Sequence, residues 1–183
     1  MFEIIPNWHP FFVHFTLGLL IISFVLYLVT LCFPANSTLR NNLTLVANWN
    51  LWIGYAFALV TACFGWLAFN SVAHDSASHT AMTIHRNWAL TTLGMYLPVV
   101  IWSLVRAKNN LQTGWLFMIA LLVPTVLLGG TGWRGSEVVY RYGLGVMSLP
   151  RSEEHNHTHG DHDHGSSHEE SHEHTHDEQH SSH

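Results

Sequence analysis

Residues 11–33, FFVHFTLGLLIISFVLYLVTLCF, form an apolar stretch that contains no charged residue. A helix needs about 20 mainly apolar residues to cross a bilayer core roughly 30 Å thick, and this stretch is long enough. Three further uncharged runs of similar composition occupy residues 51–69, 88–105 and 114–133. Proline interrupts the third and fourth runs, which membrane helices tolerate because neighbouring groups satisfy the freed carbonyl. The sequence therefore predicts an all-α membrane protein with four spans.

The predicted connections between these spans are short, at residues 34–50, 70–87 and 106–113. Short connections place successive helices side by side in opposite directions. Residues 1–150 are thus expected to form a four-span antiparallel transmembrane helix bundle that passes the lipid bilayer several times. The polar, glycine-rich residues 130–150 predict turns and a short element along the membrane interface.

The charge of the 183-residue chain is divided unevenly. Only 10% of its residues are charged, against about 25% in ordinary soluble domains. Residues 1–151 hold all seven Lys and Arg and only three acids, whereas residues 152–183 hold the other nine acids. No phosphate-binding loop, nucleophile–base pair or basic nucleic-acid patch is visible, so we expect neither an enzyme nor a nucleic-acid partner. Cys32 and Cys63 lie inside apolar runs and are expected to be buried, inert thiols.

Five of the sixteen histidines lie in the apolar body, and four antiparallel spans place all five at one side of the membrane. His14 and His85 come from different helices at similar depth, and they are the best pair of axial ligands for a haem b. His9, His74 and His79 suit a metal-ion site nearer the surface. Interfacial anchoring of single rings and a proton relay are the alternatives, because histidine near a membrane helix end serves all of these roles.

A stripe of small residues runs along the second predicted span at helical spacing. It consists of Gly54, Ala58, Thr61 and Gly65. Small residues let another helix or a flat cofactor approach the backbone closely. Helix packing is the favoured interpretation.

The segment 151–183 is a low-complexity tail without aromatic or aliphatic residues. It cannot bury enough apolar area to offset its chain entropy, so we expect it to be disordered without a ligand. Imidazole with carboxylate suits Zn²⁺, Cu²⁺, Ni²⁺ and Co²⁺, and the frequent His-x-His spacing lets a flexible chain wrap one ion. A pH-sensing tail and an expression tag are the alternatives. The predicted tail ligands are His155, His157, His159, His162, His164, His168, His172, His174, His176, His180 and His183.

Two segments carry a resemblance to a known family: NWHPFFVHFTLGLLIISF at residues 7–24 and GSEVVYRYGLGV at residues 135–146. Over residues 5–148 the chain resembles the bacterial membrane proteins of domain of unknown function 2231. The resemblance implies a four-helix domain of the bacterial inner (cytoplasmic) membrane, found alone or joined to redox domains. His9 and His14 match the two histidines of the family's first motif. The chain departs from the family at Tyr142, where histidine is frequent.

These observations lead to two functional hypotheses. The first is a non-catalytic accessory protein of transition-metal homeostasis, which binds divalent ions and works with a metal efflux system. The second is a haem b electron-transfer module that uses His14 and His85 and has a redox partner. A transporter is a weaker third, because the spans lack internal carboxylates.

Overall fold

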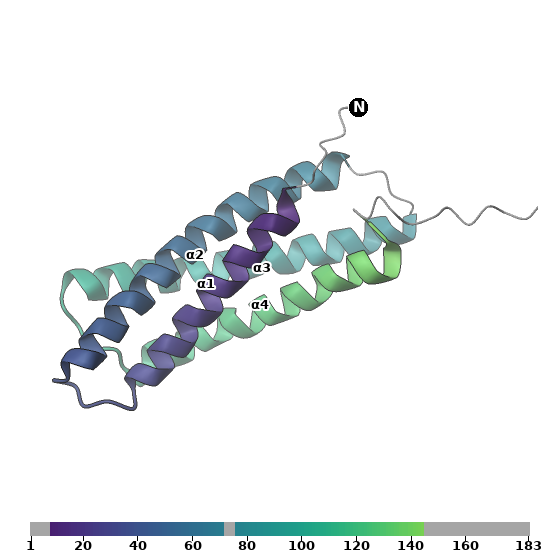
Figure 1. The fold of residues 1–183 in the computed structure, drawn as a ribbon. Coiled ribbons are helices and arrows are strands. Elements are labelled where there is room, and N and C mark those ends of the chain that lie inside the picture. Colours follow the sequence, from purple (N-terminus) through teal and green to yellow (C-terminus); the bar gives the residue numbers. More distant parts are fainter. Residues whose placement is uncertain (1–7, 72–75, 145–183) are drawn as a thin grey trace, which may run out of the picture. The chain divides into compact units, whose positions relative to one another are not determined.

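A computed structural model describes residues 8–71 and 76–144, and four helices account for most of this part (Figure 1). They are α1 (His9–Thr30), α2 (Thr38–Ser71), α3 (Ser76–Lys108) and α4 (Trp115–Tyr142). All four are long and apolar enough to cross a membrane. The prediction of an all-α protein with four spans is confirmed. Residues 151–183 lie outside the described part, so the prediction for the tail stays a prediction.

The last three helices are longer than the apolar runs that predicted them. α2 begins at Thr38 and α3 at Ser76, inside segments that were expected to be connections. The first turns of α2 are polar, and the Thr44 hydroxyl bonds back to its own helix by donating to the Arg40 carbonyl at 2.8 Å. Apolar composition marks the part of a helix that lipid surrounds, and polar residues continue the same helix beyond it.

The expectation of turns after the fourth span is wrong, because α4 continues to Tyr142. The Glu137 carboxylate lies 3.0 Å from the Arg134 guanidinium and 2.9 Å from that of Arg141, and pairs at these spacings stabilise a helix. The helix ends at Gly143, whose φ of 61° is the left-handed conformation that favours glycine.

The helices associate as two hairpins. α1 packs mainly against α2, and α3 packs mainly against α4, with smaller contacts of α2 with α3 and of α1 with α4 (Figure 1). Only a narrow stripe of each helix is buried, and the remaining surface is largely apolar, as lipid contact requires. Cys32 and Cys63 lie on this exposed surface. The expectation that both thiols are buried is therefore wrong.

The two hairpins bury equivalent positions of their helices. In α1 the buried residues are Thr16, Leu20, Ser23, Tyr27 and Thr30. Each of these positions has an equivalent in α3, at the same distance along the chain as His85 lies after His9. The equivalent residues are also buried: Thr92, Tyr96, Val99, Ser103 and Arg106. In α2 the buried residues are Ala47, Asn48, Leu51 and Gly54. Each of them has an equivalent in α4, at the same distance along the chain as Thr131 lies after Thr61. These equivalents are buried as well: Phe117, Met118, Leu121 and Pro124. The bundle is thus built as a repeated helical hairpin.

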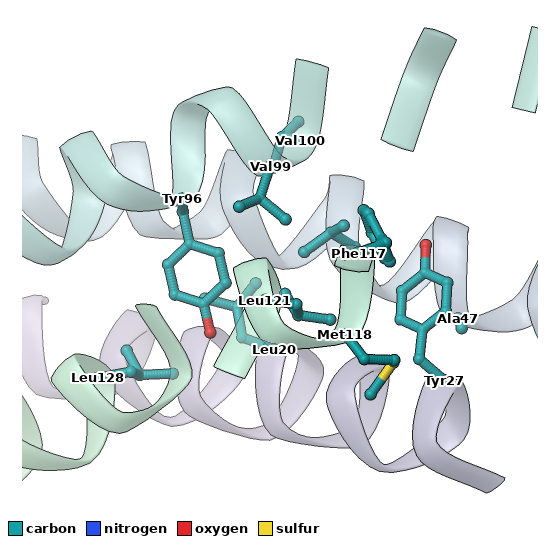
Figure 2. Close-up of a cluster of buried hydrophobic side chains, with 11 residues drawn as sticks. Leu20, Tyr27, Ala47, Tyr96, Val99, Val100, Phe117, Met118, Leu121 and Leu128 are labelled. Carbon is teal, nitrogen blue, oxygen red and sulfur yellow. The ribbon is translucent and has the colours of Figure 1, made fainter. Parts of the chain in front are cut away.

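The core combines apolar packing with a buried polar network. Figure 2 shows Tyr27 beside Phe117, and their ring centroids lie 5.0 Å apart. The Tyr27 hydroxyl donates to the Asn48 side-chain oxygen, to which the Ser103 hydroxyl also donates at 3.0 Å. The Trp52 indole donates to Ser103 at 3.0 Å. These bonds join α1, α2 and α3 near the C-terminal end of α1, and they satisfy polar groups that would be costly to bury unpaired.

Two arginines close the same end of the bundle. Arg106 is 5% exposed, and its guanidinium carbon lies 4.2 Å from the Phe117 ring centroid, where the ring face attracts a cation. Arg40 donates to the carbonyls of Phe33 and Thr113 at 3.0 and 2.9 Å. Arg40 therefore ties the turn between α1 and α2 to the turn between α3 and α4.

Candidate functional site

The rings of His9 and His85 meet near the N-terminal end of α1, opposite the polar network. Their centroids lie 6.3 Å apart and their planes are inclined by 80°, so one ring presents its edge to the other. His9 is the first residue of α1, and His85 lies in the early part of α3. The structure thus brings two imidazoles from different hairpins together, and it pairs His85 with His9.

His9 is held by the backbone of α2. Its Nδ1 donates to the Thr61 carbonyl oxygen at 3.0 Å. Because a carbonyl oxygen only accepts, Nδ1 carries the hydrogen in the neutral ring and the lone pair belongs to Nε2. One turn further along α2 is Gly65, where an added Cβ would lie 2.9 Å from Cε1 of the ring. The imidazole lies directly on the helix backbone, and glycine leaves the room for it.

His85 lies against α4 at the equivalent place, with its ring near the backbone of Thr131. An added Cβ at Gly135 would lie 3.0 Å from Cε1 of the ring. The Nδ1 atom of His85 is buried and has no hydrogen-bond partner. A buried ring nitrogen in this state is the atom that a ligand would satisfy.

Two threonine pairs next to the histidine rings are also equivalent in the two hairpins. The hydroxyls of Thr16 and Thr61 hydrogen-bond at 2.9 Å, and those of Thr92 and Thr131 at 2.8 Å. Each of these hydroxyls also lies within hydrogen-bond distance of a carbonyl one turn earlier in its own helix. In each pair one hydroxyl donates to the other, which is then free to donate to its own carbonyl. The site therefore consists of two equivalent halves, each made of a histidine and a threonine on one helix and a threonine and a glycine on the next.

A repeated spacing in the sequence identifies these residues. Amino-acid composition and the position of a residue along its span do not reveal it. Histidine is followed by threonine after six intervening residues in both α1 and α3. Threonine is followed by glycine after three intervening residues in both α2 and α4, at Thr61–Gly65 and Thr131–Gly135. These spacings place the members of each pair on one face of a helix, so the repeat predicts two matching hairpins.

The other histidines of the body lie apart from this pair. His14, the predicted haem ligand beside His85, is exposed, and its Nδ1 donates to the Pro10 carbonyl of its own helix at 2.6 Å. His79 is exposed, with its ring centroid 5.5 Å from that of Phe69. His74 and the predicted tail ligands lie outside the described residues. Within residues 8–71 and 76–144 no three His, Cys, Asp or Glu side chains form a group that would hold a metal ion.

The small-residue stripe of α2 faces α1, as the packing interpretation predicts. An added Cβ at Gly54 would lie 3.0 Å from the Leu19 Cβ, and Thr61 and Gly65 contact α1 through Thr16 and His9. The stripe therefore lets the first hairpin close tightly. It also lets the His9 ring reach the α2 backbone.

A hollow of about 100 Å³ lies between α3 and α4. Its lining includes Ile84 and Arg134, which are the chain neighbours of His85 and Gly135. Tyr142, where the resembling family often has histidine, lines the same hollow, as does Glu137. This hollow therefore lies beside the second half of the site.

Comparisons with known proteins identify the family. No curated protein matches the chain, and no solved structure matches it. The family model described as predicted membrane protein (DUF2231) matches residues 6–148, which include all four helices of the described part and both rings of the histidine pair. The resemblance seen in the two sequence segments is confirmed. The chain belongs to the DUF2231 family of predicted membrane proteins.

Proposed function

We propose that this multi-pass membrane protein binds transition-metal ions through imidazole groups, as a non-catalytic accessory of metal homeostasis in the bacterial cytoplasmic membrane. It would pass the ions to a membrane efflux system. The contact between His9 and His85 carries the proposal. A metal-binding histidine commonly donates its other ring N–H to a backbone carbonyl, which fixes the ring and its tautomer. The bond from His9 to Thr61 has this form.

The tail supports the same function from its composition. It provides eleven imidazoles and nine carboxylates within residues 152–183. Such a chain collects divalent ions with little geometric selectivity, so its preference follows the general affinity order, in which Cu²⁺ is highest. The acidic groups also raise the local concentration of cations near the membrane. In this proposal the tail captures ions from solution, and the histidine pair belongs to the bundle.

Equilibrium dialysis of the purified full-length protein tests this function. The protein is dialysed separately against Zn²⁺, Cu²⁺, Ni²⁺ and Co²⁺ near neutral pH, beside a full-length variant whose eleven tail histidines are replaced by asparagine. We expect several divalent ions per wild-type chain, with Cu²⁺ held most tightly, and loss of most of them in the variant. Retention of none of these ions by the wild-type protein would overturn the proposal.

The histidine pair also supports a second candidate, a haem b electron-transfer module. Two axial imidazoles about 2 Å from a single iron have ring centres separated by roughly 6 Å, and the two rings here are 6.3 Å apart. The structure favours His9 with His85 as the ligands, in place of His14 with His85. The test is an absorption spectrum of the purified protein: a Soret band that shifts on reduction and is lost in His9→Ala supports haem, and a spectrum without this band excludes it.

A further inference from the structure

We propose that His9 and His85 together hold one monovalent copper ion between the two hairpins of the bundle. This inference rests on the proposed metal-binding function and deepens it by assigning a specific site and ion. The tail would collect divalent ions without selectivity, whereas the pair inside the bundle would select by coordination geometry and charge.

The separation of the rings fits a single shared ion. An ion bound at about 2.0 Å from each nitrogen holds the two nitrogens about 4 Å apart when the three atoms are in line. The two ring radii add to this distance, which brings the ring centres to roughly 6 Å. The observed separation is 6.3 Å. A linear arrangement also accommodates the 80° between the ring planes, because each ring can rotate about its own nitrogen–metal bond.

The repeat explains why two ligands face each other from opposite sides. His9 and His85 occupy equivalent positions of the two hairpins, and each ring lies on the glycine of the neighbouring helix. Two equivalent groups that meet lie on either side of an approximate twofold axis, and an ion between them can be bound by both. Linear coordination by two nitrogens is a preferred geometry of Cu⁺, whereas Zn²⁺ prefers four tetrahedral ligands and Cu²⁺ a tetragonal set.

The charges around the site favour a monovalent ion. Glu137, the one acidic residue in the part of the chain that the structure describes, is paired with Arg134 and Arg141. Two neutral imidazoles bring no negative charge to offset a bound cation. Since the Born cost of burying an ion rises with the square of its charge, Cu⁺ has about a quarter of the cost of a divalent ion of equal size. Low charge and few ligands point to the same ion.

The protein already holds both rings as ligands. The Nδ1–H of His9 is engaged by the Thr61 carbonyl, which leaves the lone pair on Nε2. The His85 ring lies near the Thr131 backbone, and its buried Nδ1 has no hydrogen-bond partner. An ion bound at this nitrogen would satisfy a polar atom that otherwise stays unpaired in the interior. Little rearrangement is then needed on binding.

An anaerobic competition titration tests this site in the full-length protein that carries the asparagine tail. Cu⁺ is supplied from a chromogenic chelator, with Ag⁺ as a second linear probe and Zn²⁺ as the comparison. We expect one tightly held Cu⁺ or Ag⁺ per chain and much weaker Zn²⁺. His9→Ala and His85→Ala should each lower Cu⁺ affinity at least about tenfold, while the matched control His14→Ala should leave it unchanged.

A rescue variant separates loss of a ligand from loss of the fold. Methionine is a soft ligand that binds Cu⁺ well and Zn²⁺ poorly, so His9→Met should retain Cu⁺ where His9→Ala does not. Unchanged Cu⁺ affinity in both alanine variants would overturn the inference, as would Zn²⁺ binding at the pair as tightly as Cu⁺. If the wild-type tail binds divalent ions but Cu⁺ affinity does not depend on His9 or His85, the inference is wrong and the proposed function stands. Retention of no ion at all would end both.

Discussion

The hydroxyls of Tyr27 and Ser103, which occupy equivalent positions in the two hairpins, lie 3.3 Å apart in the interior of the bundle. The rings of His9 and His85, also equivalent, meet near the other end of α1. Equivalent residues that touch one another at two separate levels define an approximate twofold axis along the bundle. One level is a satisfied hydrogen-bond network, and the other contains a buried ring nitrogen without a partner. The first level holds the hairpins together, and the second is suited to a ligand.

Tyr27→Phe should destabilise the protein by about 1–2 kcal/mol, because it removes a buried hydroxyl that bonds to Asn48 and Ser103. The measurement is the free energy of unfolding in detergent micelles. Tyr140→Phe is the matched control, since Tyr140 is 91% exposed, and it should change the stability little. Equal effects of the two substitutions would show that the network contributes nothing measurable.

Thr16→Val and Thr92→Val should destabilise the protein by similar amounts, about 0.5–1.5 kcal/mol each, because each removes one inter-helix threonine bond of nearly the same length. Double-mutant cycles with Thr61→Val and Thr131→Val measure the two pair energies separately. The repeat predicts that the two pair energies agree. A large coupling in one hairpin and none in the other contradicts it.

Gly65→Ala and Gly135→Ala should each push a histidine ring out of place, because the new methyl group would lie 2.9 Å or 3.0 Å from Cε1 of that ring. We expect lower Cu⁺ affinity in both variants, by about tenfold or more, as for other changes that misorient a ligand. Gly94→Ala and Gly129→Ala are the controls, since no atom lies within 4 Å of the added group. The controls should retain Cu⁺ and stabilise their helices by up to about 1 kcal/mol. Full Cu⁺ affinity in the first two variants would contradict the ring placement.

Divalent-ion capture by the tail should weaken as the pH falls through about 6.5, the unperturbed pKa of imidazole. A protonated ring has no lone pair for a metal, so binding is present above that pH and is lost below it. Equilibrium dialysis of the wild-type protein at several pH values against Zn²⁺ measures the change. Zn²⁺ capacity that is the same at about pH 5 and pH 7.5 would exclude imidazole as the principal ligand.

The sequence predicts the number and order of the helices because each span must remain apolar over the thickness of the bilayer. It predicts their ends poorly. Gly132 and Gly135 suggest turns, but both continue α4, and Gly135 makes room for the His85 ring. Polar groups at a helix end can bond back to the same helix or to water, so composition does not distinguish such an end from a loop.

The candidate site could be predicted only in part. Depth along the helices indicates that His9, His14 and His85 lie at one side of the membrane, but it does not indicate which ring faces the neighbouring hairpin. His14 and His9 differ by five residues along α1, so they point in different directions around the helix. The matching histidine–threonine and threonine–glycine spacings in the two hairpins indicate which histidine faces the neighbouring hairpin. It depends on packing between helices, which apolar runs alone do not encode.

X-ray absorption at the copper edge tests whether His9 and His85 hold the ion, with one equivalent of Cu⁺ bound to the full-length protein that carries the asparagine tail. We expect two nitrogen neighbours at about 2 Å, each with the outer-shell scattering of an imidazole ring. The predicted signal is absent from His9→Ala and from His85→Ala and unchanged in His14→Ala. Sulfur neighbours, four light-atom neighbours, or the same spectrum after removal of His85 would contradict the claim that these two rings hold the ion.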